Sequence, residues 1–496
     1  MITAPKYSRA KYGARSRVEI SLTVRNWIKY SHEVEFGLAV LRRVSPAAQV
    51  TNHKLPSYHV WTVGCQMNTS DSERLSAGFT NMGFESTDDM ANADVVVMNT
   101  CVVRQSAEDT ATGILGRLGK RMKGNTNRMI AVMGCMVGPQ QAELKRRFPY
   151  VDVWARPQEF EPILETAGIK HGLDPEGCLV EAVSENPNVA SFIPIVHGCD
   201  KFCTFCIIPY RRGRENSRPA FDIVHEAEMM VARGVKDITL LGQNVDSYGH
   251  DIRPRLDLAD LMEQVHEIPG LERIRFMTSH PNDMSVRIIE AIRDLPKVCE
   301  MINLPFQAGD DTVLANMRRG YTRGQFLDKI EQIQQMIPNV TLTTDLIVGF
   351  SGETDAQFEK SMDVLRAVEF SKVHTSEYSY REGTYASRKM TDDIPRAIKK
   401  ARKATVEQLQ NEIQTKNNAT LIGSNFDVLV EGRKRGRLHG RNRGDKLIYL
   451  NMAVGTEAVE PQPGQTVQVE ITDSSPWSLE AELIESRVQK EKVPVV

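Results

Sequence analysis

The chain has 496 residues, of which 41% are apolar and 25% charged, a composition typical of a globular protein with roughly two to four domains. No stretch approaches the roughly 18 apolar residues of a membrane-spanning helix, so we expect no membrane segment. The formal net charge is -2, so any binding of nucleic acid must depend on local basic patches.

The first 56 residues are basic and poor in acidic side chains, and they show no pattern that extends into a domain. We expect residues 1–56 to form a poorly ordered extension. Glu19, Glu33 and Glu35 interrupt the pattern of a transit peptide. The eight cysteines do not resemble a secreted disulfide framework, which favours thiolate ligation of metal in a reducing cytoplasm.

Residues 57–170 alternate apolar runs with helical patterns, which predicts an open parallel α/β sheet with helices on both faces. The predicted strands cover residues 58–64, 95–100 and 129–134, with helices starting at Ser70, at Arg104 and after Pro139.

Each of these three strands ends at a cysteine, in order Cys65, Cys101 and Cys135. Ligands of open α/β sheets bind beyond the carboxyl ends of the strands, so the three cysteines should converge on one crevice. One free cysteine at a strand end is equally typical of a packed core, but three of three favour ligation of a metal or cluster.

A second βα series covers residues 185–417 and predicts a partial (β/α)6 barrel whose site lies at the carboxyl ends of its strands. Its predicted strands are residues 191–196, 237–242, 273–278, 301–306, 341–349 and 374–380. Cys199, Cys203 and Cys206 follow the first strand with CxxxCxxC spacing, so we expect them at the barrel mouth.

Residues 418–486 contain short alternating runs, 426–430, 446–450, 465–471 and 479–484, which predict a small β-barrel of the oligonucleotide-binding type. Residues 487–496 form a tail. A basic loop over residues 433–446 should project from this barrel, and a second basic run follows the CxxxCxxC motif. The candidate nucleic-acid ligands are Arg433, Lys434, Arg435, Arg437, Arg441 and Arg443 in the first run, and Arg211, Arg212 and Arg214 in the second. An isolated run of this kind is also typical of a solvated loop.

Three thiolates at CxxxCxxC spacing can hold three irons of a 4Fe-4S cluster and leave the fourth without a protein ligand. An open iron can chelate the amine and carboxylate of S-adenosylmethionine, whose cleavage gives a carbon radical. A second open cluster on the three strand-end cysteines could bind or hand over sulfur, so the two together predict insertion of sulfur into a carbon-hydrogen bond. The alternatives are a zinc site, which normally takes four ligands, and a ferredoxin-like electron carrier, which has a different cysteine spacing.

These cysteines and their flanks resemble the radical S-adenosylmethionine methylthiotransferases over about residues 57–486. The similar segments are Gly64-Cys65-Gln66-Met67-Asn68, Asn99-Thr100-Cys101, Gly134-Cys135-Met136, Cys199 to Cys206 with Ile207-Ile208-Pro209-Tyr210 and Arg212-Gly213-Arg214-Glu215, and Leu241-Gly242-Gln243-Asn244-Val245. The last segment is similar to the branch that modifies N(6)-dimethylallyladenosine in tRNA. The chain departs from the pattern at Ser351 and over residues 381–385, where prolines are usual.

The resemblance implies a methylthiotransferase domain over residues 57–170, a radical S-adenosylmethionine core over 185–417 and a tRNA-binding TRAM barrel over 418–486. Cys65, Cys101 and Cys135 would hold an auxiliary 4Fe-4S cluster. Cys199, Cys203 and Cys206 would hold the radical-generating one. Phe205 would lie near the adenine of S-adenosylmethionine, and Gln243, Ser279 and Asp345 are further candidate cofactor contacts that are equally typical of strand-end structural residues.

The implied reaction adds a methylthio group to carbon 2 of N(6)-dimethylallyladenosine at tRNA position 37 and uses two S-adenosylmethionine molecules per turnover. The implied partners are the anticodon stem-loop, a low-potential electron donor such as flavodoxin or ferredoxin, and a sulfur donor. Two other functions stay open from the sequence. One is a sister methylthiotransferase acting on threonylcarbamoyladenosine in tRNA or on a ribosomal protein; the other is a non-catalytic iron-sulfur or zinc protein that binds RNA.

Overall fold

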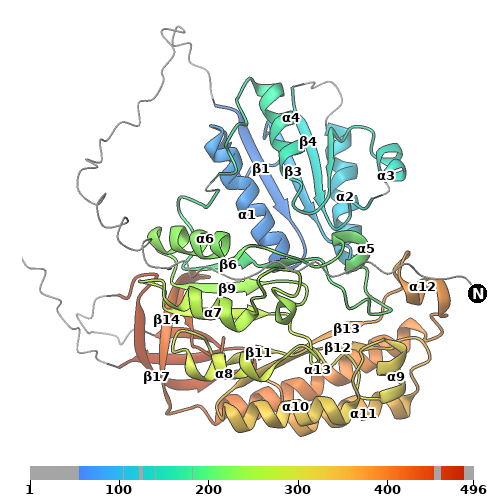
Figure 1. Ribbon diagram of the computed structural model, residues 1–496, viewed down its shortest axis with the longest axis vertical. Helices are drawn as coiled ribbons and strands as arrows, with labels where there is room; N and C mark the ends of the chain where they lie inside the picture. The colour runs from blue at the N-terminus through green and yellow to red at the C-terminus, as the bar shows by residue number, and fades with distance from the viewer. Residues whose placement is uncertain are drawn as a thin grey trace, which may run out of the picture. The chain divides into compact units, whose positions relative to one another are not determined.

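The structure is a computed structural model that describes residues 55–103, 105–121, 127–139, 141–180, 182–451 and 460–484 (Figure 1). Nearly all of the predicted N-terminal extension and the tail at 487–496 therefore lie outside the described residues. No helix among the described residues is both long and apolar enough to cross a membrane.

The N-terminal part is a five-stranded parallel sheet in the order β2-β1-β3-β4-β5. Its three central strands are the three that the sequence predicted. The strands are β1 (Ser57–Thr62), β2 (Glu85–Ser86), β3 (Val95–Thr100), β4 (Met129–Gly134) and β5 (Val153–Ala155). The helices are α1 (Gln66–Asn81), α2 (Gln105–Arg121), α3 (Ala142–Arg147) and α4 (Glu161–His171).

Helices cover both faces of this sheet. Every residue of β3 and β4 is buried, as in parallel strands packed on both sides. Val97 of β3 packs in one core with Leu75 of α1, whereas its neighbour Met98 packs in the opposite core with Leu115 of α2. This alternation confirms the predicted open α/β arrangement.

The central part contains two three-stranded parallel sheets, in the orders β10-β9-β6 and β11-β12-β13. The strands are β6 (Ala190–Pro194), β9 (Asp237–Leu241), β10 (Arg273–Met277), β11 (Met301–Asn303), β12 (Thr341–Val348) and β13 (Lys372–Glu377). A parallel bridge connects Ile274 of β10 to Val298, which lies just before β11. One hydrophobic core contains Ile193, Leu240 and Ile274 from the first sheet together with Ile302 and Leu346 from the second. The six strands therefore form the predicted partial barrel.

Helices follow the barrel strands in the expected alternation. They are α6 (Ala220–Ala232), α7 (Leu258–His266), α8 (Val286–Asp294), α9 (Asp311–Asn316), α10 (Arg323–Met336), α11 (Asp355–Val368) and α13 (Arg396–Ala419). Capping boxes at Asp257, Thr322 and Thr354 begin α7, α10 and α11 and satisfy backbone N–H groups at each helix start. Short elements lie between them: β7 (Val196–His197), α5 (Ile208–Arg212), β8 (Asn216–Ser217), the 3-10 turn η1 (Val245–Ser247) and α12 (Tyr385–Lys389).

The C-terminal part is a closed five-stranded barrel in the order β14-β15-β16-β18-β17. Its strands are β14 (Asn425–Lys434), β15 (Arg437–Arg441), β16 (Leu447–Asn451), β17 (Thr466–Ser474) and β18 (Leu479–Leu483). Val428, Val430, Ile448, Val469 and Leu479 form its core.

The predicted basic loop over residues 433–446 is wrong, because β15 runs through it and pairs with both β14 and β16. Leu438 and Gly440 are buried while Arg437, His439 and Arg441 at the alternate positions are more exposed, which is strand alternation hidden in a basic run. A side chain on residue 440 would come 2.1 Å from the carbonyl oxygen of Leu429, so the close approach of β15 to β14 requires glycine there.

Buried arginines attach this barrel to the central part. Arg273 donates to the carbonyl oxygen of Arg441 at 2.6 Å, and Arg275 donates to those of Asn442 and Arg443 at 2.9 and 2.7 Å. In return, Arg443 binds both carboxylate oxygens of Glu300 at 2.8 and 2.7 Å. The segment 441–443 therefore forms part of the interface between the C-terminal barrel and the central part, in addition to being basic.

Candidate functional site

The CxxxCxxC motif lies on a loop directly after β7. Gly198 has φ +73°, and a Cβ on it would lie 2.0 Å from the carbonyl oxygen of Arg214, so only glycine permits this turn. The N–H of Gly198 donates to Oε1 of Gln243 at 2.7 Å. The N–H of Cys206 donates to the carbonyl oxygen of Cys203 at 3.0 Å. The loop thus folds back on itself and gathers the three thiols at the carboxyl end of the first barrel strand.

Burial dominates the chemistry of these thiols. Loss of water raises the pKa of Cys199 to about 11 and that of Cys206 to about 12, and the neighbouring Cys203 adds to both shifts. Arg319, itself buried, donates from Nη1 to Sγ of Cys203 at 3.3 Å. A positive N–H donor at sulfur is the kind of contact that stabilises a thiolate bound to metal.

The strand-end cysteines converge as predicted. Charges on Cys65 and Cys101 both act on Cys135, whose pKa burial raises to about 11. A Cβ on Gly64, which has φ +141°, would come 2.8 Å from Cβ of Cys101. Cys101 and Cys135 are buried and Cys65 is exposed. One thiol of this strand-end triad is thus open to the surroundings while two are held in the protein.

Asn68 ties two of these strand ends together. Its Nδ2 donates to the carbonyl oxygens of Val63 and Thr100 at 3.0 and 3.1 Å. Cys65 occupies the N-cap of α1 in an extended conformation, so the helix begins at Gln66 and not at Ser70 as predicted. The difference arises because a cysteine, and no Ser, Thr, Asp or Asn, precedes the first turn.

Arg212 connects the strand-end triad to the barrel. It ends α5, six residues after Cys206, and its Nε donates to Sγ of Cys135 at 3.4 Å. Its Nη2 donates to Asn68 at 3.0 Å and to Asp71 at 3.4 Å. Although burial acts in the opposite direction, Cys135 and Asp71 raise the pKa of Arg212 above its ordinary value. Its side chain is 2% exposed, so the phosphate contact predicted for it would have to form in a buried position.

The two cysteine triads fit the cluster chemistry that the sequence predicted. Each offers three soft sulfur donors, and each has one buried guanidinium that donates to a sulfur. Within the described ranges, no three His, Cys, Asp or Glu side chains are gathered as a site for one metal ion.

A cavity of about 870 Å³ lies between the central barrel and the N-terminal domain. Phe205 and Cys206 line it from the barrel side, together with Gln307, Asp345 and Tyr378 near the strand ends. Val103 and Gln105, which follow Cys101, line it from the N-terminal domain. The cavity is therefore shared by the two domains and reaches both cysteine-bearing loops.

Two of the four predicted cofactor contacts line this cavity, and the other two hydrogen-bond to residues at the strand ends. Phe205 and Asp345 line the cavity. Gln243 instead holds Gly198, and Ser279 donates from Oγ to Asp246 at 2.9 Å in a buried position. Gln243 and Ser279 thus support the strand ends and do not belong to the cavity lining.

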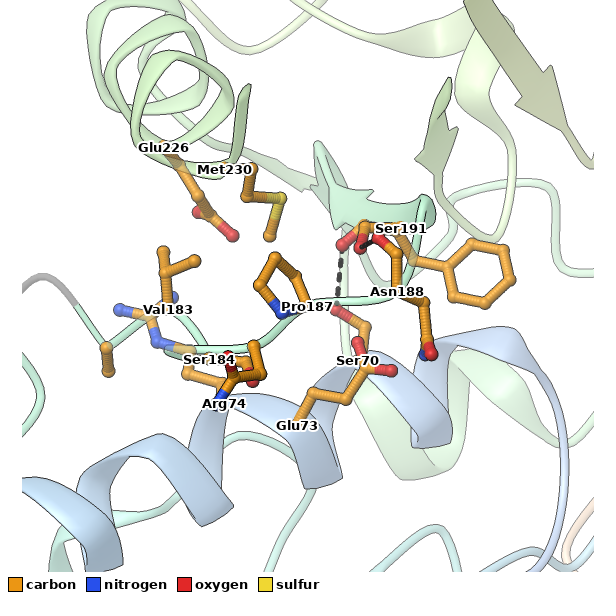
Figure 2. A pocket seen from close by; sticks show the side chains of 13 residues that line it. Ser70, Glu73, Arg74, Val183, Ser184, Pro187, Asn188, Ser191, Glu226 and Met230 are labelled. Atoms are coloured by element: carbon orange, nitrogen blue, oxygen red, sulfur yellow. Dashed lines mark hydrogen bonds between the residues drawn. The ribbon is translucent and has the colours of Figure 1, made fainter. Parts of the chain in front are cut away.

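A smaller cavity of about 140 Å³ lies between α1 and α6 (Figure 2). Figure 2 shows Glu73 and Arg74 on α1 facing the segment that leads into β6. Ser70 Oγ donates to the carbonyl oxygen of Phe192 at 3.3 Å. Its lining mixes charged and apolar side chains and contains no thiol, so this cavity belongs to the contact between the domains and not to either cysteine triad.

The remaining basic candidates lie in different surroundings. Arg214 is exposed and pairs with Asp200, at 2.5 and 2.8 Å, and the Arg211 guanidinium packs over Gly138. In the barrel, Arg433 pairs with Glu460, Arg437 with Glu480, Arg441 with Glu431 and Arg443 with Glu300. Lys434 and Arg435 are exposed and form no ion pair in the described part of the chain. They are the freest cations of the predicted tRNA-binding set.

Two buried arginines were missed by the sequence reasoning. Arg319 contacts Cys203, and Arg381 donates to the carbonyl oxygen of Val103 at 3.1 Å and to Oε1 of Gln105 at 2.9 Å. Arg381 stands where the sequence departs from the proline-containing turn of similar proteins. For Arg319, the only local signal is a basic pair before Gly320, which is also typical of a solvated turn.

The comparisons with known proteins match each part of the chain. Residues 57–156 match the uncharacterized protein family UPF0004, residues 193–365 the radical SAM superfamily and residues 419–484 the TRAM domain. The radical SAM superfamily implies a 4Fe-4S cluster and S-adenosylmethionine.

Two curated relatives are tRNA-2-methylthio-N(6)-dimethylallyladenosine synthases. The one from Dehalococcoides mccartyi is 43% identical over 87% of this chain and 99% of its own length. The one from Roseiflexus sp. is 43% identical over 86% of this chain and 90% of its own length. The radical S-adenosylmethionine methyltransferase TsrM from Kitasatospora setae has a TM-score of 0.49 and 14% identity, over 65% of this chain and 75% of that one. The chain belongs to the family of the tRNA-2-methylthio-N(6)-dimethylallyladenosine synthases.

Proposed function

We propose that this protein adds a methylthio group to carbon 2 of N(6)-dimethylallyladenosine at position 37 of tRNA. The observation that carries the proposal is the shared cavity, because Cys206 lines one side and the loop after Cys101 lines the other. A reaction that joins a radical step to a sulfur step needs both centres to reach one substrate atom. The family membership of the chain supports the same substrate.

The cysteines would hold two 4Fe-4S clusters, one on Cys199, Cys203 and Cys206 and an auxiliary one on Cys65, Cys101 and Cys135. When bound, these clusters and two S-adenosylmethionine molecules per turnover supply the radical, the sulfur and the methyl group. Phe205 and Asp345 would orient S-adenosylmethionine, since both line the cavity beside Cys206.

Arg319 and Arg212 would stabilise the charge of the bound thiolates, each from a buried position and each at one sulfur. Their guanidiniums also occupy space that water would otherwise fill next to the sulfurs. Arg381 would hold the loop after Cys101 against the cavity, because it binds Val103 and Gln105.

The tRNA would present one unstacked base to the cavity while its backbone binds elsewhere. Extruding a base costs a few kcal/mol, which contacts to the phosphate backbone can offset. Lys434 and Arg435 on the hairpin of β14 and β15 are exposed for such contacts. A low-potential electron donor such as flavodoxin or ferredoxin and a sulfur donor complete the set of partners.

The test is the nucleoside composition of tRNA from a strain that lacks the gene. We expect N(6)-dimethylallyladenosine without the methylthio group, restored to the methylthio form by the wild-type protein and not by Cys65→Ala. Unchanged methylthio content in the deletion strain would refute the proposal. Loss of the methylthio group from threonylcarbamoyladenosine instead would assign the sister reaction.

A further inference from the structure

A third cavity, of about 190 Å³, lies at the carboxyl edge of the N-terminal sheet, next to the strand-end triad. It is lined by Arg156, Pro157, Gln158, Glu159, His197, Arg211 and Arg212. These residues come from the loop after β5, from the end of β7 and from α5, so two domains build it. We call it the arginine pocket.

The charges in the arginine pocket do not balance. Three guanidiniums face it against one carboxylate, that of Glu159, which accepts from the backbone N–H of Arg156 at 2.8 Å. Arg212 is compensated by Asp71. Arg156 and Arg211 form no ion pair with any residue that the structure describes. The pocket is therefore a region of positive potential.

The three arginines that line the pocket also carry donors without acceptors. Nε of Arg156, Nε of Arg211 and Nη1 of Arg212 are shielded from solvent and have no hydrogen-bond partner among the described residues. Each buried polar group left in this state costs about 1–3 kcal/mol. An anion in the cavity would offset this cost through its charge and through hydrogen bonds to other nitrogens of the guanidinium groups that line the cavity.

The surrounding backbone is shaped around these side chains. A Cβ on Gly138 would lie 1.8 Å from Nη1 of Arg211, so glycine at this position leaves the space that the guanidinium occupies. Gln158 adopts φ +71°, a left-handed conformation that non-glycine residues rarely adopt, and its Nε2 lies 2.6 Å from Nδ1 of His197. The arginines thus occupy a built cavity and not a loose surface cluster.

We propose that the arginine pocket binds a phosphate group. Planar guanidinium forks match the oxygens of phosphate, and the volume exceeds the roughly 30 Å³ share of one water molecule several times. The phosphate is either a free inorganic ion or a backbone phosphate of the RNA. The second source rests on the proposed function, whereas the first does not.

The first test measures binding of inorganic phosphate to the full-length iron-loaded protein by titration calorimetry, at constant ionic strength and without RNA or S-adenosylmethionine. We expect saturable binding to the wild type and about tenfold weaker binding to Arg156→Gln and Arg211→Gln. Arg293→Gln removes a surface charge whose one ion pair among the described residues is with its neighbour Asp294, so its phosphate affinity should equal that of the wild type. Absence of saturable binding, or equal affinity in all four proteins, overturns the proposal.

Gly138→Ala provides a variant that keeps every charge. Its added methyl group must displace the Arg211 guanidinium, so we expect phosphate affinity to fall severalfold with the iron content unchanged. Unchanged affinity in a folded Gly138→Ala protein would count against the arginine pocket as the phosphate site.

The second test identifies the source of the phosphate with an anticodon stem-loop. If inorganic phosphate competes with the stem-loop and Arg156→Gln weakens stem-loop binding severalfold, the RNA backbone supplies the group. If neither inorganic phosphate nor Arg156→Gln changes stem-loop binding, the pocket binds free inorganic phosphate. Failure of methylthio transfer overturns the proposed function alone, and failure of phosphate binding overturns this inference alone.

Discussion

The two cysteine triads are built in opposite ways. The barrel triad lies within eight residues, Cys199 to Cys206, on one loop that its own backbone folds. The strand-end triad takes Cys65, Cys101 and Cys135 from three separate strands, and parallel pairing of β1, β3 and β4 brings them together. Each triad receives one buried arginine, but Arg319 comes from the barrel itself whereas Arg212 crosses from the barrel to the other domain.

This comparison shows that the surroundings of the strand-end triad depend on the packing of the barrel against the N-terminal domain. Ile207 and Tyr210 of the barrel pack in the same hydrophobic cluster as Cys135 and Met136 of the N-terminal sheet. Arg212 can reach Cys135 only because α5 is held in this cluster. The barrel triad requires no such contact, so the two should respond differently to the same kinds of change.

Removal of the thiols should have the largest effect. The wild type should hold about eight irons after anaerobic reconstitution, from two clusters of four, and replacement of Cys199, Cys203 and Cys206 by Ala should remove about half. This variant should form no 5'-deoxyadenosine. Cys65→Ala should retain cleavage of S-adenosylmethionine and lose methylthio transfer. Iron assay and product analysis measure both.

Cys178→Ala is the matched control for the thiol variants, because Cys178 is buried in the N-terminal core and away from both triads. It should keep the full iron content. Equal loss of iron in Cys178→Ala and Cys65→Ala would contradict the strand-end triad.

A buried carboxyl near the barrel triad should make stability depend on pH. Burial raises the pKa of Asp246 from 3.8 to about 7. The backbone N–H of His280 and the hydroxyl of Ser279 donate to its carboxylate and lower the pKa, but burial has the larger effect. Between about pH 4 and pH 7 the folded protein therefore binds a proton that the unfolded chain releases. This contribution to stability is complete below about pH 4 and is lost as the pH rises through 7.

Asp246→Asn removes the titrating group. We expect the free energy of unfolding of the wild type, relative to this variant, to fall by up to about 4 kcal/mol as the pH rises through that window. Calorimetric Tm values of both proteins at several pH values measure it. Parallel pH profiles would show that Asp246 does not titrate in this range.

Arg212 and Arg319 should each raise the midpoint potential of the cluster held by the triad that it contacts. Loss of a charge-assisted hydrogen bond to sulfur costs about 1.4 kcal/mol, which for a one-electron couple corresponds to about 60 mV. Arg212→Gln should lower the midpoint potential of the auxiliary cluster by this amount and leave the other cluster unchanged. Arg319→Gln should do the reverse. Potentiometry followed by electron paramagnetic resonance separates the two, and a shift of both clusters in either variant would contradict separate control.

Substitutions in the contact between the C-terminal barrel and the central barrel should have the smallest effect on stability. Arg443 binds Glu300 through two oxygens and also donates to the carbonyl oxygens of Pro296 and Val298. Arg443→Gln should lower the free energy of unfolding by about 1 kcal/mol, since the site is partly exposed. Arg433→Gln, whose ion pair with Glu460 is more exposed, should change it by less than about 0.5 kcal/mol. Equal losses would mean that this contact adds nothing beyond a surface pair.

The sequence could predict the strand-end convergence because parallel strands place their carboxyl ends at one edge. It could not predict β15, since its alternation of Leu438 and Gly440 is masked by arginines. It could not predict that Arg212 is buried, because a basic run gives no sign of which member is buried. Gln243 and Ser279 lie at strand ends as expected, but their hydrogen bonds to Gly198 and Asp246 depend on neighbours far away in the chain.

The sequence by itself determined the two sets of thiols, the order of the three folded parts and the family, because short cysteine spacings and strand-helix alternation are local properties of a chain. Only the tertiary structure decided which charges serve those thiols. Burial and partner choice arise from packing between segments that are distant in sequence. Arg319 therefore became visible only in the folded barrel, and Arg212 and the arginine pocket only where two domains meet.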